Sequence, residues 1–88
     1  MSCTVRIASP LRSYADGAAQ LRAHGDTLAE VLAHLEQRCP GIRFRMIDEH
    51  ERIRPHMRLF VNNNEARELS AAVRDGDTVH VICALSGG

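Results

Sequence analysis

The chain has 88 residues, with 11 basic and 11 acidic side chains, and its formal net charge at pH 7 is zero. This length suits one small domain, which can bury roughly 60–70% of the surface of its unfolded chain. The charge balance argues against binding to nucleic acid or to an anionic membrane, because those partners select a basic surface.

The first predicted elements are the two strands of a hairpin. Residues 3–8 alternate apolar and polar side chains, which predicts a half-buried strand that Pro10 ends. Asp16-Gly17 is a turn signal, and residues 18–23 are expected to form the returning strand.

A helix over residues 27–39 is the clearest predicted element. Thr27 and Glu30 form a T-x-x-E capping box, in which each side chain accepts a hydrogen bond from a backbone N–H of the first turn. Asp26 is an alternative cap. Pro40-Gly41 ends the helix, which at about 1.5 Å per residue is about 19 Å long and can cover one face of a small sheet. Apolar residues recur at helical spacing and form one stripe: Leu28, Val31, Leu32, Leu35 and Cys39.

Further strands are predicted in the second half of the chain. A mixed apolar pattern and a charged loop at residues 48–52 precede a short strand at residues 59–61. Three asparagines at 62–64 predict a tight turn, because Asn tolerates positive φ. Residues 66–69 are expected to form a brief return strand.

The most apolar strand is predicted near the C-terminus. Residues 70–73 suggest a single turn, and Asp75-Gly76-Asp77 predicts a break before a strand at residues 78–84. The order strand, strand, helix, strand, short strand, strand is typical of an α+β fold with the helix on one face of the sheet.

The cysteines and histidines suggest no metal site. Cys3, Cys39 and Cys83 are odd in number and widely spaced, so neither a disulfide framework nor a zinc knuckle is indicated, and buried thiols in a reducing compartment are expected. The five histidines form no H-x-x-x-H pair. The sequence has no signal-like apolar region and no run near the ~20 apolar residues of a membrane span, so we expect a cytoplasmic protein without a membrane partner.

The sequence ends in a pair of glycines, Gly87 and Gly88, preceded by Leu85 and Ser86. Glycine lacks a side chain, so such a segment can lie in a slot too narrow for other residues. Four extended residues reach at most about 13 Å at ~3.3 Å each. We therefore expect a domain at residues 1–84 and a flexible tail at residues 85–88 that enters a partner's active site. A loose end or a cloning remnant is the alternative.

Five short segments of the chain, taken in their order, resemble those of one known family. The family is the MoaD/ThiS-type sulfur carriers, which have the ubiquitin-like β-grasp fold, and the resemblance covers essentially the whole chain. The resemblance implies a mixed sheet of four to five strands with one main helix on one face. The segments are Gly25-Asp26-Thr27-Leu28, Cys39-Pro40-Gly41, Leu59-Phe60-Val61-Asn62-Asn63, Asp75-Gly76-Asp77-Thr78-Val79 and Gly87-Gly88.

The resemblance also implies that the chain is no enzyme but a consumed and regenerated cosubstrate, or the small subunit of a synthase complex. A partner of the ubiquitin-activating type would use ATP to convert the Gly88 carboxylate into an acyl adenylate. Sulfide or a persulfide would then displace AMP and leave a thiocarboxylate, whose ionised sulfur is a good nucleophile near neutral pH. The chain itself would bind no cofactor, since ATP is used by the partner.

The acceptor implied by the resemblance is the large subunit of molybdopterin synthase, a cysteine synthase-like enzyme or a thiazole synthase-like enzyme. The length and the charged loop after the helix favour the first two. Leu85 and Ser86 depart from the Val-Ala or similar pair that is common before the diglycine in molybdopterin carriers. In this scheme Gly88 carries the reactive group, and Gly87, Ser86 and Leu85 thread the partner's channel.

A second candidate site is an apolar patch on the sheet. If Leu59 and Val61 face the helix, Phe60 faces the opposite side, and the same alternation in the last strand turns His80 and Ile82 outward. We predict that Phe60, His80 and Ile82 form a docking patch for the activating enzyme and the acceptor. The alternative is that neighbouring loops partly cover these residues.

Two other function classes share this fold. A ubiquitin-like modifier would deliver the activated Gly88 to a lysine of another protein, and a β-grasp interaction module would not need the tail. The chain contains no lysine, which excludes conjugation to its own side chains.

Overall fold

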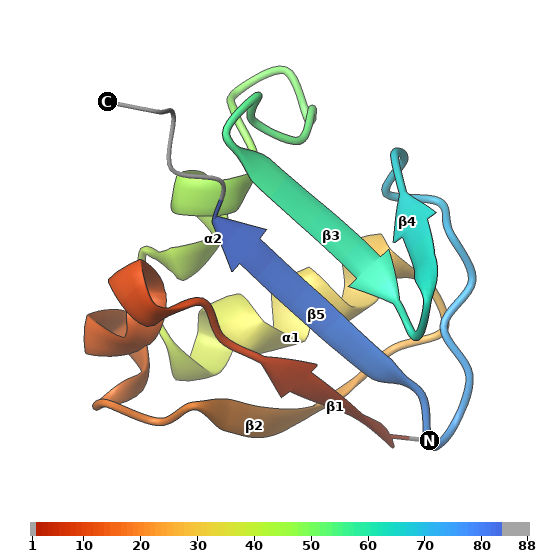
Figure 1. Ribbon diagram of the computed structural model, residues 1–88, viewed down its shortest axis with the longest axis horizontal. Coiled ribbons are helices and arrows are strands. Elements are labelled where there is room, and N and C mark those ends of the chain that lie inside the picture. Colours follow the sequence, from red (N-terminus) through yellow and green to blue (C-terminus); the bar gives the residue numbers. More distant parts are fainter. Residues whose placement is uncertain (1, 84–88) are drawn as a thin grey trace.

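Five strands and one main helix make up the domain. The computed structural model describes residues 2–83, with helix α1 (Leu28–Arg38) packed on one face of a sheet of strand order β2-β1-β5-β3-β4 (Figure 1). β1 and β5 pair in parallel and the other neighbours are antiparallel, which confirms the predicted α+β fold with a mixed sheet. The strands are β1 (Ser2–Arg6), β2 (Gln20–His24), β3 (Met57–Val61), β4 (Asn64–Ala66) and β5 (Thr78–Cys83).

The predicted N-terminal hairpin is present, with a short helix inserted between its strands. Residues after β1 form the 3-10 helix η1 (Ser9–Ala15), so β2 begins at Gln20 and not at residue 18. Proline suits the first turn of a helix because it lacks an N–H that would be unpaired there, and Pro10 occupies that position. Leu11 and Ala15 are buried, which holds η1 against the core.

Helix α1 begins at the predicted cap, although one hydrogen bond differs. The Glu30 N–H donates to the Thr27 side-chain oxygen at 3.3 Å, as expected. The Glu30 carboxylate, however, accepts from the Asp26 N–H at 2.8 Å, one residue before the position that a capping box predicts. All five residues of the predicted stripe are buried, at 2% exposure or less.

The segment after β4 caps α1. The predicted return strand is present as β4, but it spans Asn64–Ala66, so its predicted bounds of residues 66–69 were wrong. The following residues instead cross the start of the helix, where the Ala71 and Leu69 carbonyls accept from the Leu28 and Ala29 N–H groups, both at 2.9 Å. The first turn of a helix leaves its N–H groups without helical partners, and this distant segment pairs two of them.

A second helix was missed in the sequence. α2 (Ile42–Met46) follows Gly41, its N-cap residue, which has a φ of 95°. Ile42, Met46 and the following Ile47 are buried, whereas Phe44 points outward and is 59% exposed. A five-residue helix contains little more than one turn, too short for a periodic pattern to identify.

Asn62 joins the β3–β4 turn to the start of β5. It has a φ of 56°, as expected for an Asn in a tight turn, and its side-chain amide donates to Asp77 at 3.0 Å. Its side-chain oxygen accepts from the Thr78 N–H, also at 3.0 Å. The pKa of the Asp77 carboxyl is lowered mainly by the hydrogen bond from the Asn62 amide and, to a smaller extent, by one from the Arg74 backbone N–H.

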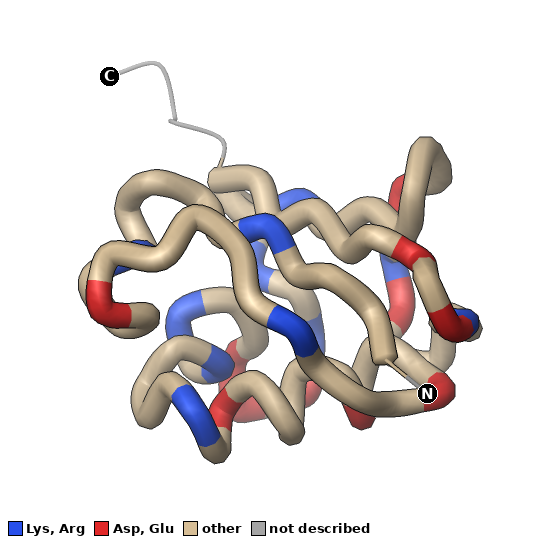
Figure 2. Tube along the Cα trace, turned by 90° about the horizontal axis from the view of Figure 1, so that it is seen from below, with Lys and Arg blue, Asp and Glu red and all other residues tan. Residues whose placement is uncertain are grey.

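Charged residues of both signs are distributed along the trace, as Figure 2 shows. Within residues 2–83, no helix has the length and apolar character needed to cross a membrane.

Candidate functional site

The sheet face opposite α1 brings the three predicted patch residues together. The register of β3 and β5 places Phe60 directly opposite His80 and Arg58 opposite Ile82. Residues paired in this way share a face, and their diagonal neighbours lie within reach of long side chains. Ile82 is 44% exposed, whereas Phe60 and His80 are half-buried. The open face therefore presents a narrow apolar strip with its most exposed part at Ile82.

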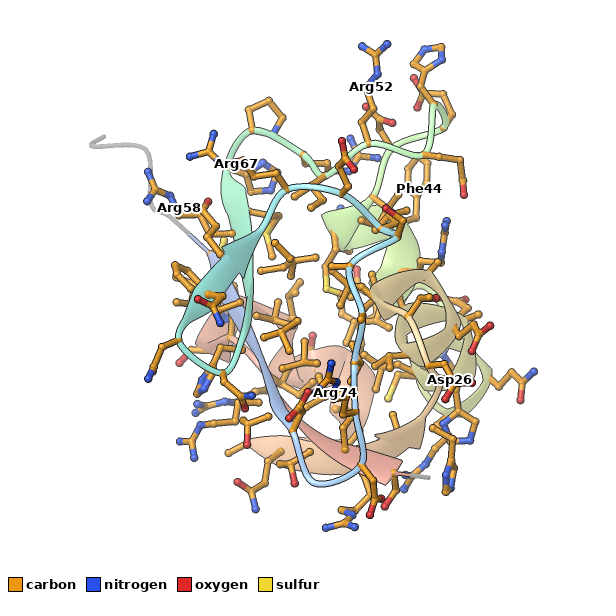
Figure 3. The ribbon with its side chains drawn as sticks, turned by 90° about the vertical axis from the view of Figure 1, so that its right-hand side faces the viewer. Asp26, Phe44, Arg52, Arg58, Arg67 and Arg74 are labelled. Carbon is orange, nitrogen blue, oxygen red and sulfur yellow. The ribbon has the colours of Figure 1, made fainter. Side chains whose placement is uncertain are left out.

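Arginines flank this strip on both sides. Arg6 of β1 lies opposite His80, and Arg58 of β3 lies opposite Ile82. Figure 3 shows the Arg58 side chain projecting outward from the strands, on the side away from Asp26 at the start of α1. Farther along the same row, Glu65 of β4 lies opposite Phe60. The sequence pattern did not identify the two arginines, because their placement depends on how β1, β5 and β3 pair.

A groove of about 460 Å³ adjoins the strip at the C-terminal end of β5. Its basic residues are Arg6 and Arg12, together with His80, and none of the described residues that line it is Asp or Glu. The Arg12 Nε donates to the Ile7 carbonyl at 3.1 Å, which holds the guanidinium at the groove wall. Cys83, the last described residue of β5, also lines the groove, so the chain leaves the described domain at this point.

The predicted tail lies outside the described residues. Gly88, the predicted carrier of the reactive group, and Gly87, Ser86 and Leu85, the predicted threading segment, all follow the last described residue. The structure places the chain as far as Cys83, which lies beside the groove and the apolar strip.

The described histidine and cysteine side chains are not arranged for metal binding or for thiol chemistry. In the described range, no group of three or more His, Cys, Asp or Glu side chains could hold a metal ion. His24 and His34 lie edge to face, with ring centroids 4.9 Å apart, and the His34 Nδ1 accepts from the His24 backbone N–H. Burial raises the pKa of the Cys3 and Cys39 thiols, which keeps them in the unreactive protonated form.

Comparison with known proteins gives consistent similarities. The ThiS family model matches residues 5–88. The chain is 34% identical over 93 residues to the sulfur carrier protein CysO of Mycobacterium tuberculosis, with all of both chains covered. It has a TM-score of 0.92 and 34% identity to a chain in the crystal structure of the Amycolatopsis orientalis BexX/CysO complex, covering 98% of this chain and 99% of that one.

A more distant structure has the same fold. SAMP1 from Haloferax volcanii is 23% identical, has a TM-score of 0.84, and is matched over the full length of both chains. At this identity the similarity concerns the fold alone.

Proposed function

The chain belongs to the ThiS family of sulfur carrier proteins, and from this premise we propose that its sulfur is carried as a thiocarboxylate on Gly88. The observation that carries the proposal is the family match, which runs through residue 88 and so includes both terminal glycines. The domain would thus serve as a handle for a reactive group at the end of the chain. It would act as a cosubstrate that is consumed and regenerated in the cytoplasm, without catalysing the reaction.

Two chemical steps are proposed at Gly88. First, an activating enzyme joins the Gly88 carboxylate to the α-phosphate of ATP and releases pyrophosphate, because a free carboxylate is a poor electrophile. Second, sulfide attacks the carbonyl carbon, a C–S bond forms, and the C–O bond to AMP breaks. The thiocarboxylate that remains is ionised near neutral pH and can attack the acceptor's substrate. ATP is bound by the partner in this scheme and not by the carrier.

The docking site for these partners is proposed to be the strip of Phe60, His80 and Ile82. Exposed apolar surface next to the origin of the tail would let one partner hold the domain while the tail occupies its active site. The half-burial of Phe60 and His80 leaves Ile82 as the main apolar contact.

The acceptor pathway is proposed from the relatives. Similarity to proteins named CysO favours a cysteine synthase-like acceptor over molybdopterin synthase or a thiazole synthase. The Amycolatopsis orientalis crystal structure holds CysO in a complex with BexX, which supports a protein partner for this chain.

Intact-protein mass spectrometry tests the proposal. The chain ending at Gly88 is incubated with ATP, sulfide and the activating enzyme from the same organism, and one oxygen is expected to be replaced by sulfur at the C-terminus. Deletion of Gly87 and Gly88 should abolish the change. Gly87→Val should block it with the fold intact, because a branched side chain does not fit a channel made for glycine.

Two results would contradict the proposal. An unmodified C-terminus in the presence of an active enzyme would remove the adenylation step. An isopeptide bond between Gly88 and a lysine of another protein, without a thiocarboxylate, would indicate a ubiquitin-like modifier. Unchanged modification of Gly87→Val would reject the narrow channel alone.

A further inference from the structure

β5 extends beyond its parallel neighbour. The pairing of β1 with β5 ends at Arg6 and His80, whereas β5 continues to Cys83 beside β3. Beyond Arg6 the chain still pairs on the β2 side, where the Ile7 N–H donates to the Ala19 carbonyl at 2.8 Å, and it then enters η1. Figure 1 shows the arrow of β1 ending well before the tip of β5. The last residues of β5 therefore form an edge without a strand beside them on the β1 side of the described chain.

The backbone of this edge faces the groove. Successive residues of a strand direct their N–H and C=O groups to opposite neighbours. The Thr4 N–H donates to the Asp77 carbonyl at 3.0 Å, so the backbone of Asp77 faces β1. By the same alternation the backbone groups of Val81 and Cys83 face the β1 side, and both residues line the groove. The bridge between Arg6 and His80 uses the Val81 N–H, which leaves the Val81 carbonyl and the backbone groups of Cys83 for a further strand. A strand edge of this kind is a template for an added strand.

The charge of the groove selects what such a strand carries. Arg6 and Arg12 lie on the β1 side and the η1 side of the groove, and its described lining contains no carboxylate to pair with them. Arg12 is fixed through its Nε by the Ile7 carbonyl, and this leaves its terminal N–H groups for a ligand. The Arg6 side chain is exposed, and its contact with Gln20, at 3.5 Å, is long. Arginine binds carboxylates through paired, charge-assisted hydrogen bonds.

We propose that the groove binds an extended acidic segment of a partner protein, which adds as a strand to the free edge of β5. Its backbone pairs with the Val81 carbonyl and with the N–H and carbonyl of Cys83, and carboxylates at alternate positions bind Arg6 and Arg12. Strand addition gives affinity through the backbone and specificity through alternate side chains. The identity of the partner as the activating or acceptor enzyme rests on the proposed function. A segment bound here lies beside Cys83, close in sequence to the predicted tail.

A peptide titration followed by NMR tests this binding. The probe is the capped pentapeptide acetyl-Glu-Val-Glu-Val-Glu-amide, and its matched control has Gln in place of each Glu. We expect the acidic peptide to shift the backbone amide signals of Val81, Ile82 and Cys83. The Gln peptide should bind about tenfold more weakly, because charge-assisted hydrogen bonds are replaced by neutral ones.

Variants of the protein locate the binding charges. Arg6→Gln and Arg12→Lys should each weaken the acidic peptide several-fold, the second because Lys keeps the charge but loses the paired geometry. Arg22→Gln is the matched control, since Arg22 lies on the same sheet face but outside the groove, and it should bind as the unmodified chain does.

Two outcomes would overturn the proposal. One is equal affinity for the Glu and Gln peptides, and the other is an absence of shifts at residues 81–83 at millimolar peptide. Because the titration contains neither ATP nor an enzyme, its failure leaves the chemistry at Gly88 untouched. Conversely, a negative mass-spectrometric result would leave the peptide site in place.

Discussion

Truncation of Ile82 should weaken binding of the activating enzyme by an amount set by the exposure of this side chain. Burying a whole Ile side chain contributes about 1.5–3 kcal/mol, and 44% of Ile82 is still exposed in the free domain. Docking would bury that remainder, so Ile82→Ala should lose about 0.7–1.3 kcal/mol of binding free energy. This corresponds to an increase of about three- to ninefold in Kd.

The matched control for this prediction is Phe44→Ala. Phe44 is more exposed than Ile82, at 59%, but it belongs to α2 and packs against the Arg54 guanidinium outside the sheet face. Calorimetric titration of both variants against the activating enzyme gives the two Kd values, and circular dichroism checks that both remain folded. Ile82→Glu is a less clean test, because the new carboxylate lies opposite Arg58 and can pair with it.

Either of two results would refute the proposal that Phe60, His80 and Ile82 form the docking site. If Ile82→Ala binds with unchanged Kd, the side chain is not buried in the complex. If Phe44→Ala weakens binding by the same factor, the effect is not specific to the sheet face.

Three further predictions concern the domain itself. Gly25→Ala should cost about 3 kcal/mol of unfolding free energy, because the new methyl would lie 2.6 Å from the Val31 nitrogen. Gly76→Ala adds a methyl to open space and should cost less, about 1–2 kcal/mol. Urea unfolding measures both values. The pKa of Asp77 is lowered in the folded state, so the stabilisation by its carboxylate is complete above the unfolded pKa of about 3.9 and is lost as the pH falls through the folded pKa. Asp77→Asn should therefore lose less thermal stability below pH 4 than the unmodified chain does. An equal loss in both proteins would contradict this. Half-buried Cys83 should react with iodoacetamide before the two buried cysteines do, as peptide mapping would show, and simultaneous labelling would argue against the burial described here.

Local patterns in the sequence were sufficient to predict the elements that depend on local periodicity. The apolar stripe of α1 and the alternation in β1, β3 and β5 were predicted correctly, because each repeats over several residues. The bounds of the return strand, residues 66–69, were predicted wrongly, since the chain after Ala66 leaves β3 and the Leu69 and Ala71 carbonyls pair with the start of α1, far away in the sequence. No local pattern reports such a pairing.

The same distinction applies to the candidate site. Alternation alone placed Phe60, His80 and Ile82 on the open face, where the structure also has them. Arg6 joins them only because β1 pairs in parallel with β5, and the two strands come from opposite ends of the chain. Arg12 is placed by η1, which follows β1. Their role at the groove could therefore be inferred only after the register was known.

The central place of β5 affects how the domain withstands pulling at its C-terminal end. β5 is paired with β1 over residues 78–80 and with β3 over residues 79–83. Tension along the axis of β5 loads both rows of hydrogen bonds in shear. Many of these hydrogen bonds must therefore break at the same time and not one after another. An edge strand would peel away under much smaller force. The domain should therefore resist unfolding when force is applied through β5.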